Sequence, residues 1–412
     1  MVITREVYTS GDYSYILKAD GTAEICAYSG NGGIVTVPAT LDGIRVTGIA
    51  GAVFAENSSI KKITVSEGIT SVGDAAFAGC ENLTAVVLPS SVTSLGERAF
   101  ANCTSLKSVN LGSITEIDER TFMSCTSLVS ITIPETAKSI GNHAFIMCES
   151  LESLTVPESV HEIGNYAFAW CYGLVSFDFP EKLDHLGYGA FRGCRSLAGE
   201  LKLPFGLTEI GSFTFYGCTS ITSAVIPDSV MWIREKAFYG CGSLSDVTLS
   251  KGLLNMWRHA FAGCPIDELV LPYGMMVVGA GSVPSGVLTV PETVRFLRSA
   301  GGSNLVEEGS CAHDTCIAFN LGYDFIEYEK HTHTTTGEVT CTDHVYCTNC
   351  GAAVLESHGH VYSRKVTLPT CTADGYITYT CRDCGHSYTE ATIPAGHVLA
   401  SDGKCTGCNY NK

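Results

Sequence analysis

The cysteine and histidine residues near the C-terminus are those best able to do chemistry, because their spacing suits a metal ion. Three C-x-x-C pairs each place two thiolates on one tight turn, which is half of a tetrahedral zinc site. The segment also has few large apolar side chains, so it needs a metal or a cross-link to hold a fold. We predict structural Zn²⁺ here, and the predicted ligands are Cys341, Cys347, Cys350, His360, Cys371, Cys381, Cys384, His397, Cys405 and Cys408.

These residues group into two sites and one incomplete pair. The first site combines Cys341, Cys347 and Cys350 with either His358 or His360. The second combines Cys371, Cys381, Cys384 and His397, and the last pair, Cys405 with Cys408, either shares His397 or binds no metal. Disulfides are the rival interpretation if the protein is exported, and an unstructured tail is the third. No cluster shows an open metal position beside a general base, so we do not expect a catalytic zinc.

Residues 369–397, PTCTADGYITYTCRDCGHSYTEATIPAGH, carry a family resemblance. They resemble short zinc-ribbon-like modules repeated at the ends of large bacterial surface proteins, a likeness that covers about residues 337–412. The resemblance implies a small metal-stapled tail, separate from the rest of the chain.

The remainder of the chain is dominated by an internal repeat of about 23 residues. The repeated phenylalanines are Phe54, Phe77, Phe100, Phe122, Phe145, Phe168, Phe191, Phe215, Phe238 and Phe261. A cysteine follows three residues after each of the last nine, and these are Cys80, Cys103, Cys125, Cys148, Cys171, Cys194, Cys218, Cys241 and Cys264. Such a period indicates a solenoid with one repeat per turn, because stacked repeats bury the apolar face that one repeat alone cannot.

Each repeat predicts two strands and a turn. Residues 128–134 (LVSITIP) alternate apolar and variable side chains, as a strand does, and end at a proline. A shorter extended piece follows, as at residues 160–164 (VHEIG), and the A-F-x-x-C segment predicts a helical or 3₁₀ turn. The unit at residues 111–117 is shorter than the usual repeat by one residue, and that at residues 197–204 is longer by one residue.

The recurring A-F-x-x-C-x-x-L and I-P elements resemble the Treponema pallidum-type leucine-rich repeat of BspA-like surface proteins, over about residues 34–296. The resemblance implies a mainly β solenoid, a right-handed coil with short helical turns. We expect an N-terminal β cap (residues 1–33), the solenoid (34–303) and a helix-and-strand cap (304–330). A linker (331–337) and the Cys/His-rich tail (338–412) would follow.

The nine repeat cysteines predict structure rather than chemistry. Each occupies one fixed position of the coil, pointing inward, where a small apolar side chain packs well. Neighbouring coils at strand spacing hold stacked Cβ atoms about 4.8 Å apart, beyond the distance of about 3.8 Å that a disulfide prefers. We therefore predict free, buried and unreactive thiols.

Composition and motifs argue against catalysis and against nucleic acid. The formal charge of −17 disfavours a phosphate backbone or an anionic membrane as a partner, and no apolar run is long enough to span a membrane. None of the common catalytic motifs is present. His161-Glu162 and the Cys311, His313, Asp314 group are better explained as surface and packing residues.

Exposed aromatic and basic side chains concentrate in the middle repeats, where interface anchors would be expected. Tyr166 and Arg195 accompany the predicted ligand-binding set, although several of these residues could equally pack against neighbouring turns. Such rings suit a protein interface or stacking on sugars. The predicted ligand-binding residues are Trp170, Tyr172, Tyr188, Arg192, Tyr216, Trp232, Tyr239 and Trp257.

We predict a non-enzymatic binding or adhesion scaffold, secreted or at the bacterial cell surface. The resemblance to BspA-like proteins implies a host or extracellular-matrix protein, or a glycan, as ligand. The alternative is an intracellular protein–protein adaptor with structural zinc knuckles. The first residues, MVITREVYTSGDYSYIL, lack the pattern of a signal peptide, so the sequence is either that of an intracellular protein or that of a mature part.

Overall fold

The structure is a computed structural model of the 412-residue chain, which divides into two compact units, Met1–Ile326 and Glu327–Lys412. Each unit is considered by itself. The described residues are 6–272, 275, 277–279, 281–282, 287–290, 296–297, 304–306, 323–325, 345–346, 353–355, 362–367, 375–381 and 387–393.

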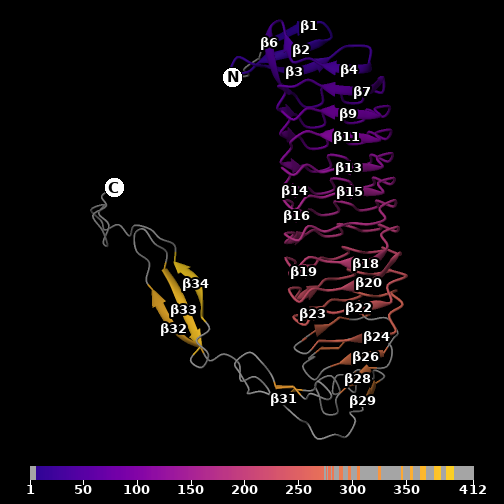
Figure 1. Cartoon of the computed structure of the whole chain (residues 1–412), viewed down its shortest axis with the longest axis vertical. Coiled ribbons are helices and arrows are strands. Elements are labelled where there is room, and N and C mark those ends of the chain that lie inside the picture. Colours follow the sequence, from indigo (N-terminus) through magenta and orange to yellow (C-terminus); the bar gives the residue numbers. More distant parts are fainter. Residues whose placement is uncertain are drawn as a thin grey trace, which may run out of the picture. The chain divides into compact units, whose positions relative to one another are not determined.

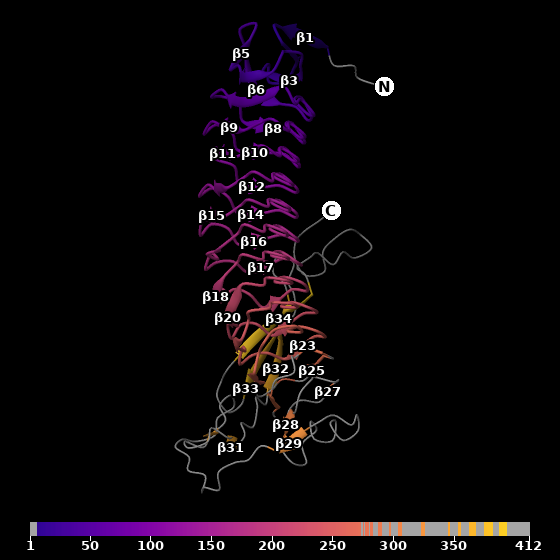
Figure 2. The same ribbon diagram turned by 90° about the vertical axis from the view of Figure 1, so that its right-hand side faces the viewer.

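The first unit is a stack of β coils, about 23 residues each, with two strands in most coils (Figures 1 and 2). The longer strands pair in parallel and form what we call the long-strand ladder. Its strands are β4 (Gly33–Val37), β7 (Ile60–Val65), β9 (Ala85–Leu88), β11 (Ser108–Leu111), β13 (Ser130–Thr132), β15 (Ser153–Thr155), β18 (Gly199–Lys202), β20 (Ile221–Val225), β22 (Asp246–Thr248), β24 (Glu268–Val270), β26 (Val287–Val290), β28 (Asn304–Val306) and β29 (Tyr323–Phe325).

The shorter strands form a second parallel face, the short-strand ladder, visible in Figure 2. Its strands are β6 (Ile44–Ile49), β8 (Ser71–Val72), β10 (Ser94–Leu95), β12 (Glu116–Ile117), β14 (Ser139–Ile140), β16 (Glu162–Ile163), β17 (His185–Leu186), β19 (Glu209–Ile210), β21 (Trp232–Ile233), β23 (Asn255–Met256), β25 (Val277–Val278) and β27 (Phe296–Leu297).

At the N-terminal end, antiparallel strands join this face. β1 (Val7–Ser10), β2 (Tyr13–Leu17) and β3 (Ala23–Tyr28) form a meander whose last strand pairs with β6, and β5 (Thr40–Leu41) also pairs with β6. Pairing with the meander covers the backbone groups that the first coil would otherwise expose.

The second unit contains strands in two groups, described here without reference to the solenoid. β30 (Val345–Tyr346) pairs with β31 (Ala353–Leu355), and β32 (Tyr362–Thr367), β33 (Gly375–Cys381) and β34 (Ser387–Ile393) form an antiparallel sheet. The predicted zinc ligands lie outside the described residues, apart from Cys381, of which the backbone alone is described as the end of β33.

The A-F-x-x-C segments are not helical turns, so that part of our prediction is wrong: the described residues contain no helix. Their N–H groups alternate between two kinds of partner. The N–H of Ala78 donates to the carbonyl of Ala75 in the same turn (3.0 Å), whereas that of Gly79 donates to Ala101 in the next coil (2.8 Å). A helix would direct every N–H along its own axis, so hydrogen bonding between coils replaces it.

This alternation requires left-handed backbone at two positions of each coil, two residues before and two residues after the repeated phenylalanine. In the coil of Phe168 these are Tyr166 (φ 54°) and Trp170 (φ 60°). The same two positions have positive φ in all ten coils, whatever residue occupies them. The fold, not the local sequence, therefore sets the backbone there.

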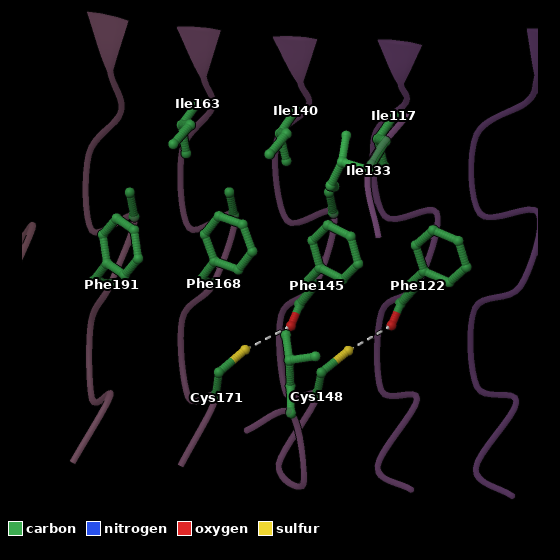
Figure 3. Packing of buried hydrophobic residues seen from close by; sticks show 14 of the residues in the cluster. Ile117, Phe122, Ile133, Ile140, Phe145, Cys148, Ile163, Phe168, Cys171 and Phe191 are labelled. Atoms are coloured by element: carbon green, nitrogen blue, oxygen red, sulfur yellow. Dashed lines mark hydrogen bonds between the residues drawn. The ribbon is translucent and has the colours of Figure 1, made fainter. Parts of the chain in front are cut away.

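The solenoid interior is a continuous stack of identical side chains (Figure 3). Successive phenylalanine rings lie 4.9–5.7 Å apart with interplanar angles of 3–19°, and all ten are buried. Offset stacking of this kind adds to the hydrophobic gain from burial. The phenylalanine stack thus runs unbroken from the coil of Phe54 to that of Phe261.

The repeat cysteines are free and buried, as predicted. Each thiol donates to the carbonyl of the phenylalanine in the preceding coil, as Cys148 does to Phe122 at 3.1 Å (Figure 3). Burial raises the pKa of the Cys80 thiol to about 11 and that of Cys218 to about 12. A thiol that stays protonated is a poor nucleophile and a poor metal ligand.

Both ladders are interrupted where the repeat changes length. At the 22-residue step from Phe100 to Phe122, β11 does not pair with β13, nor β10 with β12. Around the 24-residue step from Phe191 to Phe215, residues 175–179 form no strand and β17 does not pair with β19. The long-strand ladder also stops between β22 and β24. Added or missing residues shift the register, and hollows open at the first two of these points.

Candidate ligand-binding surface

Three outward positions of the A-F-x-x-C turn vary widely from coil to coil, whereas the inward phenylalanine is the same in all ten coils. They lie two residues before, one after and two after the phenylalanine. In the coil of Phe77 they carry Ala75, Ala78 and Gly79. In later coils they carry aromatic rings and cations, which form a contiguous group together with Tyr188, three residues before Phe191. This group, which we call the aromatic–cationic ladder, consists of His143, Tyr166, Trp170, Tyr188, Arg192, Phe213, Tyr216, Lys236, Tyr239 and His259.

The rings of the aromatic–cationic ladder contact one another across six coils. Tyr166 lies 5.1 Å from Tyr188, and Tyr188 lies 5.2 Å from Phe213. Farther along, Tyr216 stacks on Tyr239 at 5.0 Å with an interplanar angle of 6°. Ring-on-ring contact fixes the position of each side chain before any ligand arrives, which lowers the entropy lost on binding.

Two glycines make room for the bulkiest rings. A Cβ atom on Gly189 would lie 2.7 Å from Cε1 of Tyr166, and one on Gly193 would lie 2.9 Å from Cδ1 of Trp170. Real Cβ atoms do not approach carbon so closely. Both glycines have positive φ, which glycine adopts without penalty. The two rings therefore pack against these glycines in the coil of Phe191.

Arg192 is the central cation of the aromatic–cationic ladder. Its guanidinium lies 5.5 Å from the ring centre of Trp170, 5.4 Å from that of Phe213 and 4.9 Å from that of Tyr216. Within the described part of the chain it makes no ion pair. Cation–π contact thus holds the guanidinium in place while leaving its N–H groups available to a ligand.

A second cluster lies on the short-strand face. The guanidinium of Arg234 lies 5.6 Å from the ring of Trp232 and 5.3 Å from that of Trp257. It also pairs with Glu209, whose Oε2 accepts from Nη2 at 2.6 Å and from Nε at 2.8 Å. Trp257 remains 46% exposed. The two tryptophans are thus brought together by one arginine although they belong to different coils.

Between the two groups lies a hollow of about 430 Å³ at the gap separating β17 from β19. We call it the insertion hollow because it lies at the 24-residue step. Tyr188, which also belongs to the aromatic–cationic ladder, and Trp257 of the second cluster both line it. The insertion hollow therefore connects the aromatic–cationic ladder and the cluster around Arg234 into one surface.

Two titratable groups of this region, Tyr188 and Glu235, have shifted pKa values, and each shift favours the usual charge state. Burial and a hydrogen bond with Tyr166 raise the pKa of Tyr188 to about 12, so the phenol stays neutral. Burial acts to raise the pKa of Glu235, but the hydrogen bond and charge of Arg258, with Lys236, outweigh it and lower the pKa. Neither shift prepares its group to transfer a proton at neutral pH.

The structure brings together most of the residues predicted from sequence. Tyr172 stands apart, where Arg195 covers its ring at 5.0 Å. Sequence reasoning missed His143, Phe213, Lys236 and His259. All four lie two residues before a repeated phenylalanine, so aligning the repeats on that position would have found them.

Within the described residues no group of histidine, cysteine and acidic side chains could hold a metal ion, and no apolar helix is long enough to cross a membrane. The predicted tail zinc sites lie outside these residues.

Comparison with known proteins agrees with this architecture. No curated protein matches the chain. A leucine rich cell surface protein from Faecalibacterium prausnitzii is similar at 26% identity and a TM-score of 0.51, over 80% of this chain and 97% of that one. A leucine-rich repeat protein from Bacteroides ovatus shares 21% identity over 73% of this chain and all of that one, with a TM-score of 0.48. The T. pallidum leucine rich repeat protein also shares 21%, over 63% and 90%, with a TM-score of 0.29.

The family description "BspA type Leucine rich repeat region" matches residues 47–175 and 161–282, which together span more than half of the chain. These limits enclose the coils that carry the aromatic–cationic ladder and the insertion hollow. With its 23-residue β coils and its buried phenylalanine stack, the chain belongs to the BspA-type leucine-rich-repeat family.

Proposed function

We propose that the protein is a non-enzymatic binding scaffold at the bacterial cell surface, and that its ligand, a protein or a glycan, docks on the aromatic–cationic ladder. The observation that carries the proposal is the unbroken run of ring contacts over six coils, with Arg192, which forms no ion pair with any described residue, at its centre. Rigid aromatic side chains and arginine dominate the energetics of many interfaces.

The rest of the solenoid supports a binding role. Its nine repeat thiols are buried and donate to backbone carbonyls, so they are withdrawn from chemistry. Its coils stack on one another without a break in the phenylalanine core, which gives a long and stiff surface. Extended repeat surfaces of this kind suit large ligands.

The cell-surface location rests on family likeness. The similar Faecalibacterium prausnitzii protein is described as a leucine rich cell surface protein. Antibody labelling of intact cells should detect this protein without permeabilisation. Labelling that appears only after lysis would contradict the location and favour the intracellular adaptor.

The binding role is tested by a triple variant, Trp170→Ala, Tyr216→Ala and Tyr239→Ala. We expect at least about a tenfold loss of affinity for any ligand found on an array of matrix proteins and glycans, because interface rings carry most binding energy. The matched control removes apolar side chains exposed elsewhere, with Phe205→Ala, Val175→Ala and Val225→Ala. Equal affinities for the two triple variants would refute the proposed surface.

A further inference from the structure

The insertion hollow is a consequence of one extra residue. From β12 to β17 the coils of the short-strand face pair at a 23-residue offset, as Glu162 does with His185. The next offset is 24 residues, from His185 to Glu209, and there the pairing is lost. The hollow of about 430 Å³ occupies this gap, and its volume is in the range of sites for small ligands.

Its lining combines two aromatic walls with polar groups. Tyr188 and Trp257 are 39% and 46% exposed, high values for large rings. Asn165, Glu209 and Arg234 also line the hollow. The amide Nδ2 of Asn165 has no hydrogen-bond partner in the described part of the chain, so a donor is available to a ligand.

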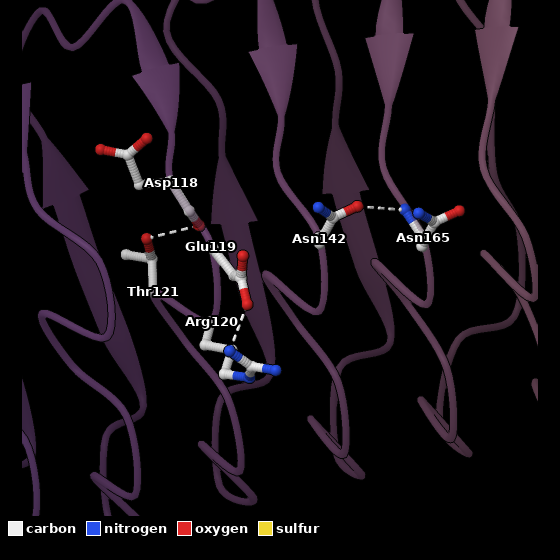
Figure 4. A network of polar contacts seen from close by, with 6 residues as sticks. All are labelled: Asp118, Glu119, Arg120, Thr121, Asn142 and Asn165. Carbon is white, nitrogen blue, oxygen red and sulfur yellow. Dashed lines mark hydrogen bonds and ion pairs between the residues drawn. The ribbon is translucent and has the colours of Figure 1, made fainter.

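The lining is held in place before a ligand arrives. The Oδ1 of Asn142 accepts from the backbone N–H of Asn165 at 2.8 Å (Figure 4). The Oδ1 of Asn165 accepts in turn from the N–H of Tyr188 at 2.8 Å, which fixes the backbone beneath that ring. Arg234 clamps Glu209 through two hydrogen bonds. Preorganised polar groups of this kind bind with less loss of entropy.

The charges in the hollow are matched within the protein. Glu209 pairs with Arg234, and Glu235 pairs with Arg258 at 3.0 Å and with Lys236 at 3.5 Å. An anionic ligand would therefore face carboxylates as well as cations. A neutral ligand rich in hydroxyl groups can donate hydrogen bonds to the carboxylates and accept them from the cations without separating these ion pairs.

We propose that the insertion hollow binds a neutral saccharide unit of a glycan, an inference that rests on the proposed binding function and names its ligand class. The C–H face of a pyranose ring carries partial positive charge and complements the negative face of an indole or phenol. Trp257 and Tyr188 supply these faces, while Asn165, Glu209 and Arg234 bind the equatorial hydroxyls.

The test is a titration of the full chain with neutral tetrasaccharides, namely maltotetraose, cellotetraose and chitotetraose, with a heparin-derived tetrasaccharide as the anionic comparison. All three tryptophans of the chain, Trp170, Trp232 and Trp257, lie in the middle coils, so intrinsic fluorescence reports this region, and calorimetry gives the affinity. Trp257→Ala should weaken neutral-sugar binding about tenfold or more. Glu209→Gln keeps the volume and should weaken it severalfold, while Phe205→Ala should leave it unchanged.

Saturable binding of a neutral tetrasaccharide that both hollow variants weaken supports the proposal, provided their melting curves match wild type. Absence of neutral-sugar binding overturns it, as does binding that neither hollow variant changes. In one outcome, an array ligand binds the wild-type chain and loses affinity for the triple variant of Trp170, Tyr216 and Tyr239, while no neutral sugar binds. That result supports the proposed binding function and refutes the saccharide site. If nothing binds the wild-type chain, both proposals fall.

Discussion

The coils of Phe54 to Phe122 and those of Phe145 to Phe261 share one interior and differ in their outward side chains. In both regions the repeated phenylalanines and cysteines are buried. One residue after the phenylalanine, the first three coils carry alanine, as at Ala78, whereas later coils carry Arg192, Tyr216 and Tyr239. The same backbone thus serves as plain support in one region and as a candidate binding surface in the other.

The difference shows which positions the fold constrains. Inward side chains must match their neighbours in the stack, so each change there is felt by two coils. Outward side chains meet solvent, and even bulky aromatic residues are accommodated in left-handed backbone, as at Tyr166, Trp170 and Phe213. This conformation costs about 1–2 kcal/mol for residues other than glycine, and the hydrogen bonds between coils offset it, since alanines such as Ala52 and Ala75 adopt it too.

The largest expected effect tests whether the interior is equivalent in both regions. Phe100→Ala and Phe168→Ala should each lower the free energy of unfolding by about 3–5 kcal/mol, because each leaves a cavity between two stacked rings. Met147→Ala, at a 42% exposed side chain, should change it by less than about 0.5 kcal/mol. Urea unfolding would measure all three, and a much smaller loss at Phe100 would break the equivalence.

A smaller effect is expected where the later coils seat their rings. Gly193→Ala should cost about 1–3 kcal/mol, from the left-handed backbone (φ 75°) together with the contact to Trp170. Gly240→Ala is the matched control, since Gly240 has φ 70° and nothing within 4 Å of an added Cβ. The difference between their melting midpoints reports the ring contact, and identical midpoints would mean that Trp170 moves freely.

The buried thiols should contribute less. Cys148→Ala removes a hydrogen bond to Phe122 and leaves a small void, so we expect a loss of about 1–2 kcal/mol. Cys148→Ser keeps a donor in the same place and should lose less. In the native protein these thiols should resist alkylation, followed peptide by peptide with mass spectrometry. Rapid labelling of Cys80 to Cys264 would show that the coils open far more readily than their packing implies.

The smallest expected effect is a pH dependence of stability that arises from His143, in the first coil of the second region. Burial and the nearby charge of Arg120 lower the pKa of His143 below 6.5, and its buried Nδ1 has no hydrogen-bond partner among the described residues. The unfolded chain therefore takes up the proton first, and this contribution to stability is lost as pH falls below about 6.5. His143→Asn should lose less stability than wild type between pH 7.5 and pH 5.5, measured by thermal unfolding. Parallel losses would rule out His143 as the titrating group.

The sequence was sufficient for the solenoid, because a 23-residue period with inward Phe, Leu and Cys leaves few ways to bury those side chains. The burial of the thiols followed from the same periodicity. Helical turns were wrongly predicted, because the local A-F-x-x-C pattern cannot reveal that every second N–H will find its acceptor one coil away. The choice between those partners depends on residues about 22 positions distant, such as Ala101 for Gly79.

The sequence showed that aromatic residues are concentrated in the middle repeats, but it did not show which of them contact one another. Tyr188 and Trp257 lie three coils apart, yet both line one hollow, because a single added residue interrupts the strand pairing between them. Tyr172 is another of the aromatic residues predicted from the sequence, but it lies elsewhere, beside Arg195. The sequence by itself determined the period, the core and the kinds of side chain available. The stacking of coils decided which of them meet, because distance across a solenoid depends on the register of neighbouring coils rather than on separation along the chain.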